Sequence, residues 1–208
     1  SGRRQKLGIR TVKVRPRSMR RSIRASGHIA WDESRMHDVT ARVDGWVEAL
    51  RTRRTGDVVR RGETLLRFYS PDLLATQREL LAATPSSRLA NVARERLRLW
   101  GMGPGAIKEM LRQGTPQRRV AIASPQAGVV LEKHVHQGAH VRTGALVFRI
   151  VDPSSVWVLV DVFERDVAHV TVGQSTKVEV PGVLERPIES KVAYVYPSVQ
   201  VTAQSARV

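Results

Sequence analysis

Three histidines lie close together in the second half of the chain, and imidazole is a common ligand for transition metals. His134 and His136 stand two residues apart, and Glu132 precedes them by two residues. Alternate residues of a β-strand point to one face, so these three side chains would lie together, with His140 shortly after them. The alternative is an exposed strand and turn without a metal. We favour the alternative, because a similar segment earlier in the chain has arginine and threonine at the equivalent positions, and we predict no metal-binding residues.

Arginine forms the second set of candidate functional residues. The chain carries 35 basic against 19 acidic residues, a net charge of +16. This charge favours acidic proteins, anionic lipids or nucleic acid as partners, and guanidinium groups pair well with carboxylates. Two clusters of arginines are either docking surfaces for acidic partners or solvated positions, and the sequence leaves both interpretations open. The clusters are Arg51, Arg53, Arg54, Arg60 and Arg61, and Arg94, Arg96 and Arg98.

The sequence offers no support for catalysis. Its lack of cysteine excludes thiol chemistry, disulfides and cysteine-based zinc sites. It has neither the G-x-S-x-G nucleophile pattern nor a G-x-x-x-x-G-K-[ST] phosphate loop, and the glycine-rich run at 101–105 fits a turn between helices. Aromatic residues make up 5% of the chain, too few for the stacking platforms of nucleic-acid binding. We therefore expect no enzyme, no catalytic or cofactor-binding residue, no cofactor and no nucleic-acid partner.

Two stretches, at about 39–69 and 119–151, repeat one pattern. Each has a pair of glycines at a six-residue offset and a proline nine residues after the second glycine. Such a repeat implies one supersecondary unit used twice. Neither copy is long enough to bury a core alone, so we expect them to fold together. The glycines are Gly56 and Gly62 in the first copy and Gly138 and Gly144 in the second.

Helices are predicted between the two repeats. Ser70-Pro71 is a helix start, because serine caps free amides and proline suits the first helical position. Thr84 to Ser87 separates a first helix from a second, and Pro104 begins a third. Three amphipathic helices of this size can cover one another's apolar faces, and we expect Met102 and Met110 in their core. The predicted inward residues are Leu73, Leu74, Gln77, Leu80 and Leu81, then Leu89, Ala93, Leu97 and Trp100, then Ile107, Met110 and Leu111.

Short strands are predicted outside the repeats, and their spacing is typical of a barrel or sandwich. No apolar run approaches the ~20 residues of a membrane span. No signal peptide is visible, and the start at Ser1 is typical either of a processed end or of a scar left by cloning. The extended run that reaches Val208 indicates a last domain that continues further. The predicted strands are 9–14, 20–31, 155–162, 176–180 and 190–195, with one helical turn within 163–172.

The second repeat carries the motifs of a known family. Gly128-Val129-Val130, Val135 to Val141 and Gly144 to Ile150 resemble the second half of a lipoyl, or barrel-sandwich-hybrid, domain, and Val156-Trp157-Val158 resembles its exit into a β-barrel. Glu164 to Gln174 is similar to the first segment of that barrel. A helical insertion between two lipoyl halves is the hallmark of the periplasmic adaptors of tripartite efflux pumps, the membrane fusion proteins of the HlyD family. The resemblance covers nearly the whole chain.

The helical insertion suggests the subfamily. Arg96 to Met102, a third helix and Arg119 to Pro125 are similar to the adaptors of resistance-nodulation-division (RND) heavy-metal efflux systems of the CusB type. Drug-efflux adaptors have a longer two-helix hairpin, for which residues 71–117 are too few at 1.5 Å per residue. Metal adaptors can carry metal-binding methionines upstream of the segment that matches Leu7-Gly8, and the methionines of this chain do not match them. These are Met19, Met36, Met102 and Met110.

The resemblance implies a mostly β fold with an α-helical insertion, in an elongated multidomain arrangement. It implies a split lipoyl domain, a short three-helix bundle or hairpin, a β-barrel and part of a membrane-proximal domain. The expected boundaries are 1–16 for the membrane-proximal strand, 17–37 with 152–208 for the barrel, 38–69 with 119–151 for the lipoyl domain, and 70–118 for the helices.

The resemblance also implies a function. The chain would be a periplasmic adaptor, associated with the inner membrane, that bridges an inner-membrane RND transporter and an outer-membrane channel for heavy-metal export. Six copies would line a conduit, with no small-molecule substrate of their own. A biotinyl or lipoyl carrier domain is the alternative from another class, but it presents a lysine at a hairpin tip, where this chain has Ser70-Pro71-Asp72. A basic nucleic-acid-binding module is the third hypothesis.

Overall fold

The structure is a computed structural model that describes residues 13–16, 22–52, 54–183, 185–196, 199–200 and 205–207. The chain forms two compact units, one of residues 29–158 and one that joins residues up to 28 with residues from 159 onward. Most of the strand predicted at 9–14, together with Met19 and Arg53, lies outside the described residues. Within the described residues no helix has the length and apolar character needed to span a membrane.

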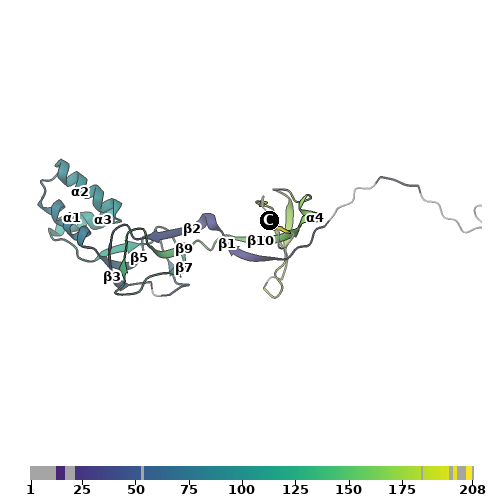
Figure 1. Cartoon of the computed structure of the whole chain (residues 1–208), viewed down its shortest axis with the longest axis horizontal. Helices are drawn as coiled ribbons and strands as arrows, with labels where there is room; N and C mark the ends of the chain where they lie inside the picture. Colours follow the sequence, from purple (N-terminus) through teal and green to yellow (C-terminus); the bar gives the residue numbers. More distant parts are fainter. Residues whose placement is uncertain are drawn as a thin grey trace, which may run out of the picture. The chain divides into compact units, whose positions relative to one another are not determined.

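The unit at 29–158 holds two four-stranded antiparallel sheets, and each sheet takes two strands from each repeat (Figure 1). Neither repeat therefore completes a sheet by itself. The first sheet has the order β2 (Met36–Thr40), β9 (Leu146–Val151), β7 (Gly128–Lys133) and β4 (Val58–Val59). The second has the order β6 (Val120–Ala123), β5 (Thr64–Tyr69), β3 (Gly45–Leu50) and β8 (His140–Val141).

Backbone hydrogen bonds join the two repeats reciprocally. The amide of Val47 donates to Ala139 O (2.9 Å), and the amide of Gly138 donates to Val47 O (2.7 Å). Val130 makes the same exchange with residues 56–57 of the first repeat, at 2.8 and 3.0 Å. The glycine turns of each repeat thus satisfy backbone groups of the other, which would be costly to bury unpaired. Two more exchanges join Ala41 to Gly144 and Ala145, and Ser124 to Gly62 and Glu63.

Equivalent glycines let the strands approach closely in both repeats. A Cβ added to Gly45 would lie 2.1 Å from Tyr69 O, and one added to Gly128 would lie 2.3 Å from Val151 O. Both oxygens belong to strands that pack against these glycines, so neither position accepts a side chain without a backbone shift. The glycine pairs of the repeat have a different role, because all four adopt positive φ in the turns.

Three helices lie between β5 and β6: α1 (Pro71–Ala82), α2 (Arg88–Leu99) and α3 (Pro104–Gln113). Ser70 caps α1, as predicted, by accepting from the amide of Leu73 at 3.4 Å. Ser87 caps α2 by accepting from the amide of Ala90 at 3.1 Å. Serine at the N-cap satisfies an amide that the first helical turn leaves free.

The helices bury most of the predicted residues, including Met102 and Met110. Two predictions are wrong: Leu89 is 59% exposed and Leu111 is 39% exposed. In α2, Ala90 takes the inward place and aligns with Ala93 and Leu97, whereas Leu89 lies on a neighbouring stripe of the helix. The buried helical side chains and those of the two sheets form one hydrophobic cluster. The helices are therefore packed onto the β-sheets.

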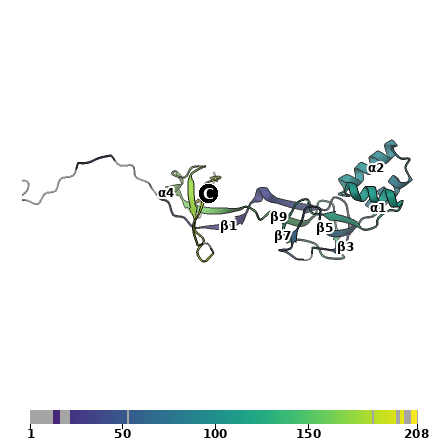
Figure 2. The same cartoon turned by 180° about the vertical axis from the view of Figure 1, so that it is seen from behind.

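The remaining strands belong to the second unit (Figure 2), except that the strand at 27–31 ends, and the strand at 156–163 begins, within residues 29–158. One sheet has the order β1 (Gly27–Trp31), β10 (Val156–Phe163), β14 (Ser205–Arg207) and β13 (Val199–Gln200), with α4 (Glu164–Val167) after β10. A separate hairpin pairs β11 (Ser175–Val178) with β12 (Ile188–Lys191). β12 stops at Lys191, so the strand predicted at 190–195 is wrong beyond that point. Val192 bonds instead to Gly173 and Gln174.

Gly128→Ala tests the close approach of the strands. The added methyl would meet the carbonyl of Val151, and we expect the free energy of unfolding to fall by about 1–3 kcal/mol, as for other overpacked sites. The free energy of unfolding is measured by urea denaturation, with circular dichroism as the signal. The control is Gly105→Ala in α3, where no atom lies within 4 Å of the added Cβ and helix propensity favours alanine. Equal stability of the two variants would contradict the prediction.

Candidate interaction site

The segment that returns from α3 to the sheet is fixed to α1 by one buried polar side chain. Gln77 is fully buried on α1. Its Nε2 donates to Gln117 O at 3.1 Å, and its Oε1 accepts from the amide of Gln117 at 2.6 Å. A buried amide side chain is costly unless it is hydrogen-bonded, so this exchange ties the beginning of the helical insertion to its end.

The same return segment is fixed to the second sheet by a carboxylate. Glu48 of β3 accepts from Arg119 Nε at 2.6 Å and pairs with Arg118 Nη2 at 2.9 Å. The hydrogen bond from Arg119, with that from Arg118, holds the pKa of the Glu48 carboxyl below its usual range. The Arg118 guanidinium also lies 4.8 Å from the ring centroid of Tyr69. These contacts attach Arg118 and Arg119 to Glu48 of β3, and Arg118 also to Tyr69 of β5.

The helical insertion leaves and returns on neighbouring strands. β5 pairs with β6, and Phe68 stands opposite Val120. Because these strands are adjacent and both ends of the insertion carry specific contacts, the three helices are held in a defined orientation on the sheets. An insertion mounted in this way can present its outer surface to another protein, and we take it as the candidate interaction site.

A second polar network crosses the first sheet. Arg149 of β9 forms a bidentate pair with Asp38 of β2, at 2.7 and 3.0 Å, and its Nη1 donates to Glu132 of β7 at 2.9 Å. The hydrogen bond from Arg149 lowers the pKa of the Asp38 carboxyl. The hydrogen bond between Glu132 and His134, with the charge of Arg149, lowers the pKa of the Glu132 carboxyl. This network links strands from both repeats.

The histidines are not gathered into one place. His134 contacts Glu132 at 2.7 Å, but β7 ends at Lys133, so the strand face predicted for His134 and His136 does not exist. His140 lies on β8 of the other sheet, with its ring 4.7 Å from that of Trp46. In the part of the chain that the structure describes, no three His, Asp or Glu side chains are grouped so that they could hold a metal ion.

The arginine clusters have different environments. The described members of the first cluster, which flank β4, are exposed. In the second cluster, Arg94 donates to Asn91, Arg96 pairs with Glu79 at 3.5 Å and Arg98 pairs with Glu95 at 3.6 Å. Exposed pairs of this kind contribute little stability, so these arginines remain able to exchange their partners for those of another protein.

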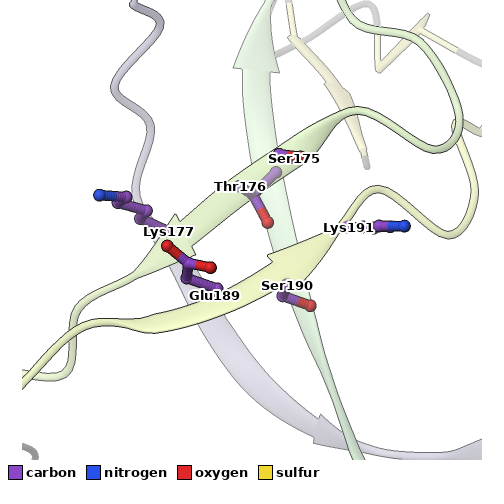
Figure 3. Close-up of a pocket in the computed structure, with 6 residues that line it drawn as sticks. All are labelled: Ser175, Thr176, Lys177, Glu189, Ser190 and Lys191. Atoms are coloured by element: carbon purple, nitrogen blue, oxygen red, sulfur yellow. The ribbon is translucent and has the colours of Figure 1, made fainter.

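An open hollow in the second unit has no features of a catalytic site. Figure 3 shows it along the β11–β12 hairpin, with Lys177 and Lys191 pointing in opposite directions. Small-molecule sites are concave and mostly apolar, with a few convergent polar groups. The hollow has mainly polar side chains on one hairpin, and we assign no ligand to it. They are Ser175, Thr176, Lys177, Glu189, Ser190 and Lys191.

Two family models match the chain in succession. The model described as "CusB, barrel-sandwich hybrid domain" matches residues 36–151, more than half of the chain, and the model described as "CusB-like, beta-barrel domain" matches residues 155–208. The chain belongs to the CusB-like family of membrane fusion proteins. These are adaptors and not enzymes, and the predicted resemblance is confirmed.

Curated relatives agree with this assignment, and a solved structure shares the fold. SilB of Salmonella typhimurium is 27% identical over 98% of this CusB-like chain and 48% of SilB. The cation efflux system protein CzcB of Alcaligenes sp. (strain CT14) is 26% identical over 83% of this chain and 38% of CzcB. The crystal structure of ZneB from Cupriavidus metallidurans has the same fold, with a TM-score of 0.58 and 22% identity over 88% of this chain and 86% of ZneB. This chain thus spans less than half the length of these two curated relatives.

Gln77→Leu tests the contact between α1 and the return segment of the CusB-like chain. Leucine leaves the amide and carbonyl of Gln117 without their partner, and we expect a loss of roughly 1–3 kcal/mol in the free energy of unfolding. Hydrogen exchange should also accelerate at residues 117–120. Gln113→Leu is the control, because Gln113 is exposed and its side chain donates a hydrogen bond to Glu109 within the same helix. Unchanged exchange at 117–120 in Gln77→Leu would show that the contact does not fix the segment.

Asp38→Asn tests the network around Arg149 through pH. Asp38 and Glu132 both have a lowered pKa in the folded state. Their stabilising contribution is therefore present above the unfolded-state values of about 4 and is lost as the pH falls through the folded-state values. We expect stability to depend less steeply on pH below about 4 in the variant than in the parent chain. Glu33→Gln, at a carboxylate with no ion pair among the described residues, should keep the parental slope, and equal slopes in all three would contradict the account.

Proposed function

We propose that this chain is the central part of a periplasmic adaptor in a tripartite RND efflux pump that exports heavy-metal cations. The observation that carries the proposal is the succession of two CusB-family matches, at 36–151 and 155–208, with the helical insertion inside the first of them. Relatives named as cation efflux and cobalt-zinc-cadmium resistance proteins support the class of cargo.

We propose the domain organisation in finer detail as well. Residues 38–69 and 119–151 would form the lipoyl domain, and 70–118 the three-helix bundle or hairpin. Residues 17–37 and 152–208 would form the β-barrel, and 1–16 a strand of a membrane-proximal domain. The interleaved strands of the two repeats support the first assignment, and the shared core of α1, α2 and α3 supports the second.

The proposed role is to connect two membranes. The helical insertion would face the outer-membrane channel, and the barrel and membrane-proximal parts would face the inner-membrane transporter. The adaptor would be periplasmic and associated with the inner membrane, and six copies would surround a conduit. The metal would pass through this conduit as cargo, without a cofactor or small-molecule substrate.

The mechanism would depend on rigid mounting of the helices. A subunit that seals a conduit must hold its contact surface in place while the transporter moves. The contacts of Gln77 with Gln117 join the first helix to the return segment, and those of Glu48 with Arg118 and Arg119 join that segment to β3. Movement would then occur between units and not at the base of the helices.

The test replaces residues 71–116 of the full-length protein with a short Gly-Ser linker. A short linker can join the end of β5 to the start of β6, because these strands are neighbours in the sheet. We expect metal resistance to be lost and co-purification with the outer-membrane channel after crosslinking to disappear. Co-purification with the transporter should remain, which also shows that the protein folds. Retained resistance, or an unshortened protein that co-purifies with neither partner, would contradict the proposed function.

A further inference from the structure

Helix α2 carries two separate apolar stripes. One is buried and consists of Ala90, Ala93 and Leu97. The other faces solvent and contains Leu89, Val92 and Leu99, which are 59%, 48% and 63% exposed. We call these three residues, together with Arg96, the outer stripe. They occupy positions i, i+3, i+7 and i+10, which place them along one side of the helix.

The spacing of the outer stripe suits a helical partner. Alternating steps of three and four residues are the pattern by which one helix packs along another. Single exposed apolar residues are ordinary on a protein surface, but these three share one side of a 12-residue helix: Leu89 and Val92 are neighbours on it, and Leu99 follows two turns later, beyond Arg96. In Figures 1 and 2, α2 lies on the side of the helical insertion away from the strands.

Charge restricts the kind of partner. α2 carries four arginines and one glutamate, and Arg88 and Arg96 lie on or beside the outer stripe. A second copy of α2 would bring two such positive helices together, within chains whose net charge is already +16. A helix with carboxylates beside its apolar residues would instead form opposite-charge pairs with these arginines.

We propose that the outer stripe binds an amphipathic helix of another protein. That helix would pack apolar side chains on Leu89, Val92 and Leu99 and place carboxylates beside Arg88 and Arg96. The inference rests on the proposed function and deepens it, because it gives the helical insertion a defined contact surface and its partner a defined chemistry.

The experiment places a photo-crosslinking amino acid at Val92 in the full-length protein in cells, and a matched one at Asn91. Both positions are exposed on α2, but Asn91 lies off the outer stripe. We expect crosslinking from Val92 to a helical peptide that contains acidic residues, identified by mass spectrometry, and little from Asn91. In a protein with the crosslinker at Glu95, which is exposed on α2 and is not one of the proposed contacts, Val92→Asp with Leu99→Asp should lower the yield about tenfold or more, as expected when a charge enters the centre of an interface. Asn91→Asp should not change it.

The outcomes separate this inference from the proposed function. Crosslinking of Val92 to a second copy, to a non-helical or basic segment, or to no protein would overturn the inference. So would a full yield in Val92→Asp with Leu99→Asp, provided that circular dichroism shows the variant to be folded. Co-purification with the transporter and channel decides the proposed function independently, and it can succeed while the outer stripe crosslinks to nothing.

Discussion

The amide of Val47, in the first repeat, donates to a turn of the second repeat. The amide of Val130, in the second repeat, donates to a turn of the first. Each repeat therefore contains backbone groups that only its counterpart can satisfy, and an unpaired buried amide or carbonyl would cost free energy. Both sheets mix strands from the two repeats for the same reason. The rest of the unit at 29–158 depends on this exchange, since neither repeat offers a complete sheet on which the helices could pack.

The interleaving also explains how a helical segment can be inserted without disturbing the sheets. β5 ends one repeat and β6 begins the other, and they lie side by side. The helices need only continue the existing core, and two polar contacts set their orientation. The Arg149 network adds a further link between repeats on the first sheet. Binding to other proteins can then be assigned to the outer surface of the helices, while the strands provide a stable support.

The repeats could be predicted from the sequence because the spacing of the glycines indicates the turns, and Ser70-Pro71 indicates a helix start. Leu89 and Leu111 were not placed correctly, because helical periodicity cannot tell which of two apolar stripes faces the core. Gln77 was correctly placed on a buried face, but its partner Gln117 lies 40 residues away and no local pattern connects them. The position of a glutamine on an apolar stripe indicates only that some hydrogen-bond partner exists, since a buried amide requires one.

Disulfide formation in Val58→Cys with Val129→Cys tests the interleaved arrangement most directly. These residues are opposite each other on β4 and β7, and the chain has no other cysteine. The account predicts a complete intramolecular disulfide in the oxidised protein, seen by non-reducing mass spectrometry, and none in Val58→Cys with His140→Cys, whose positions belong to different sheets. Free thiols in the first variant, or a disulfide only in the second, would contradict it.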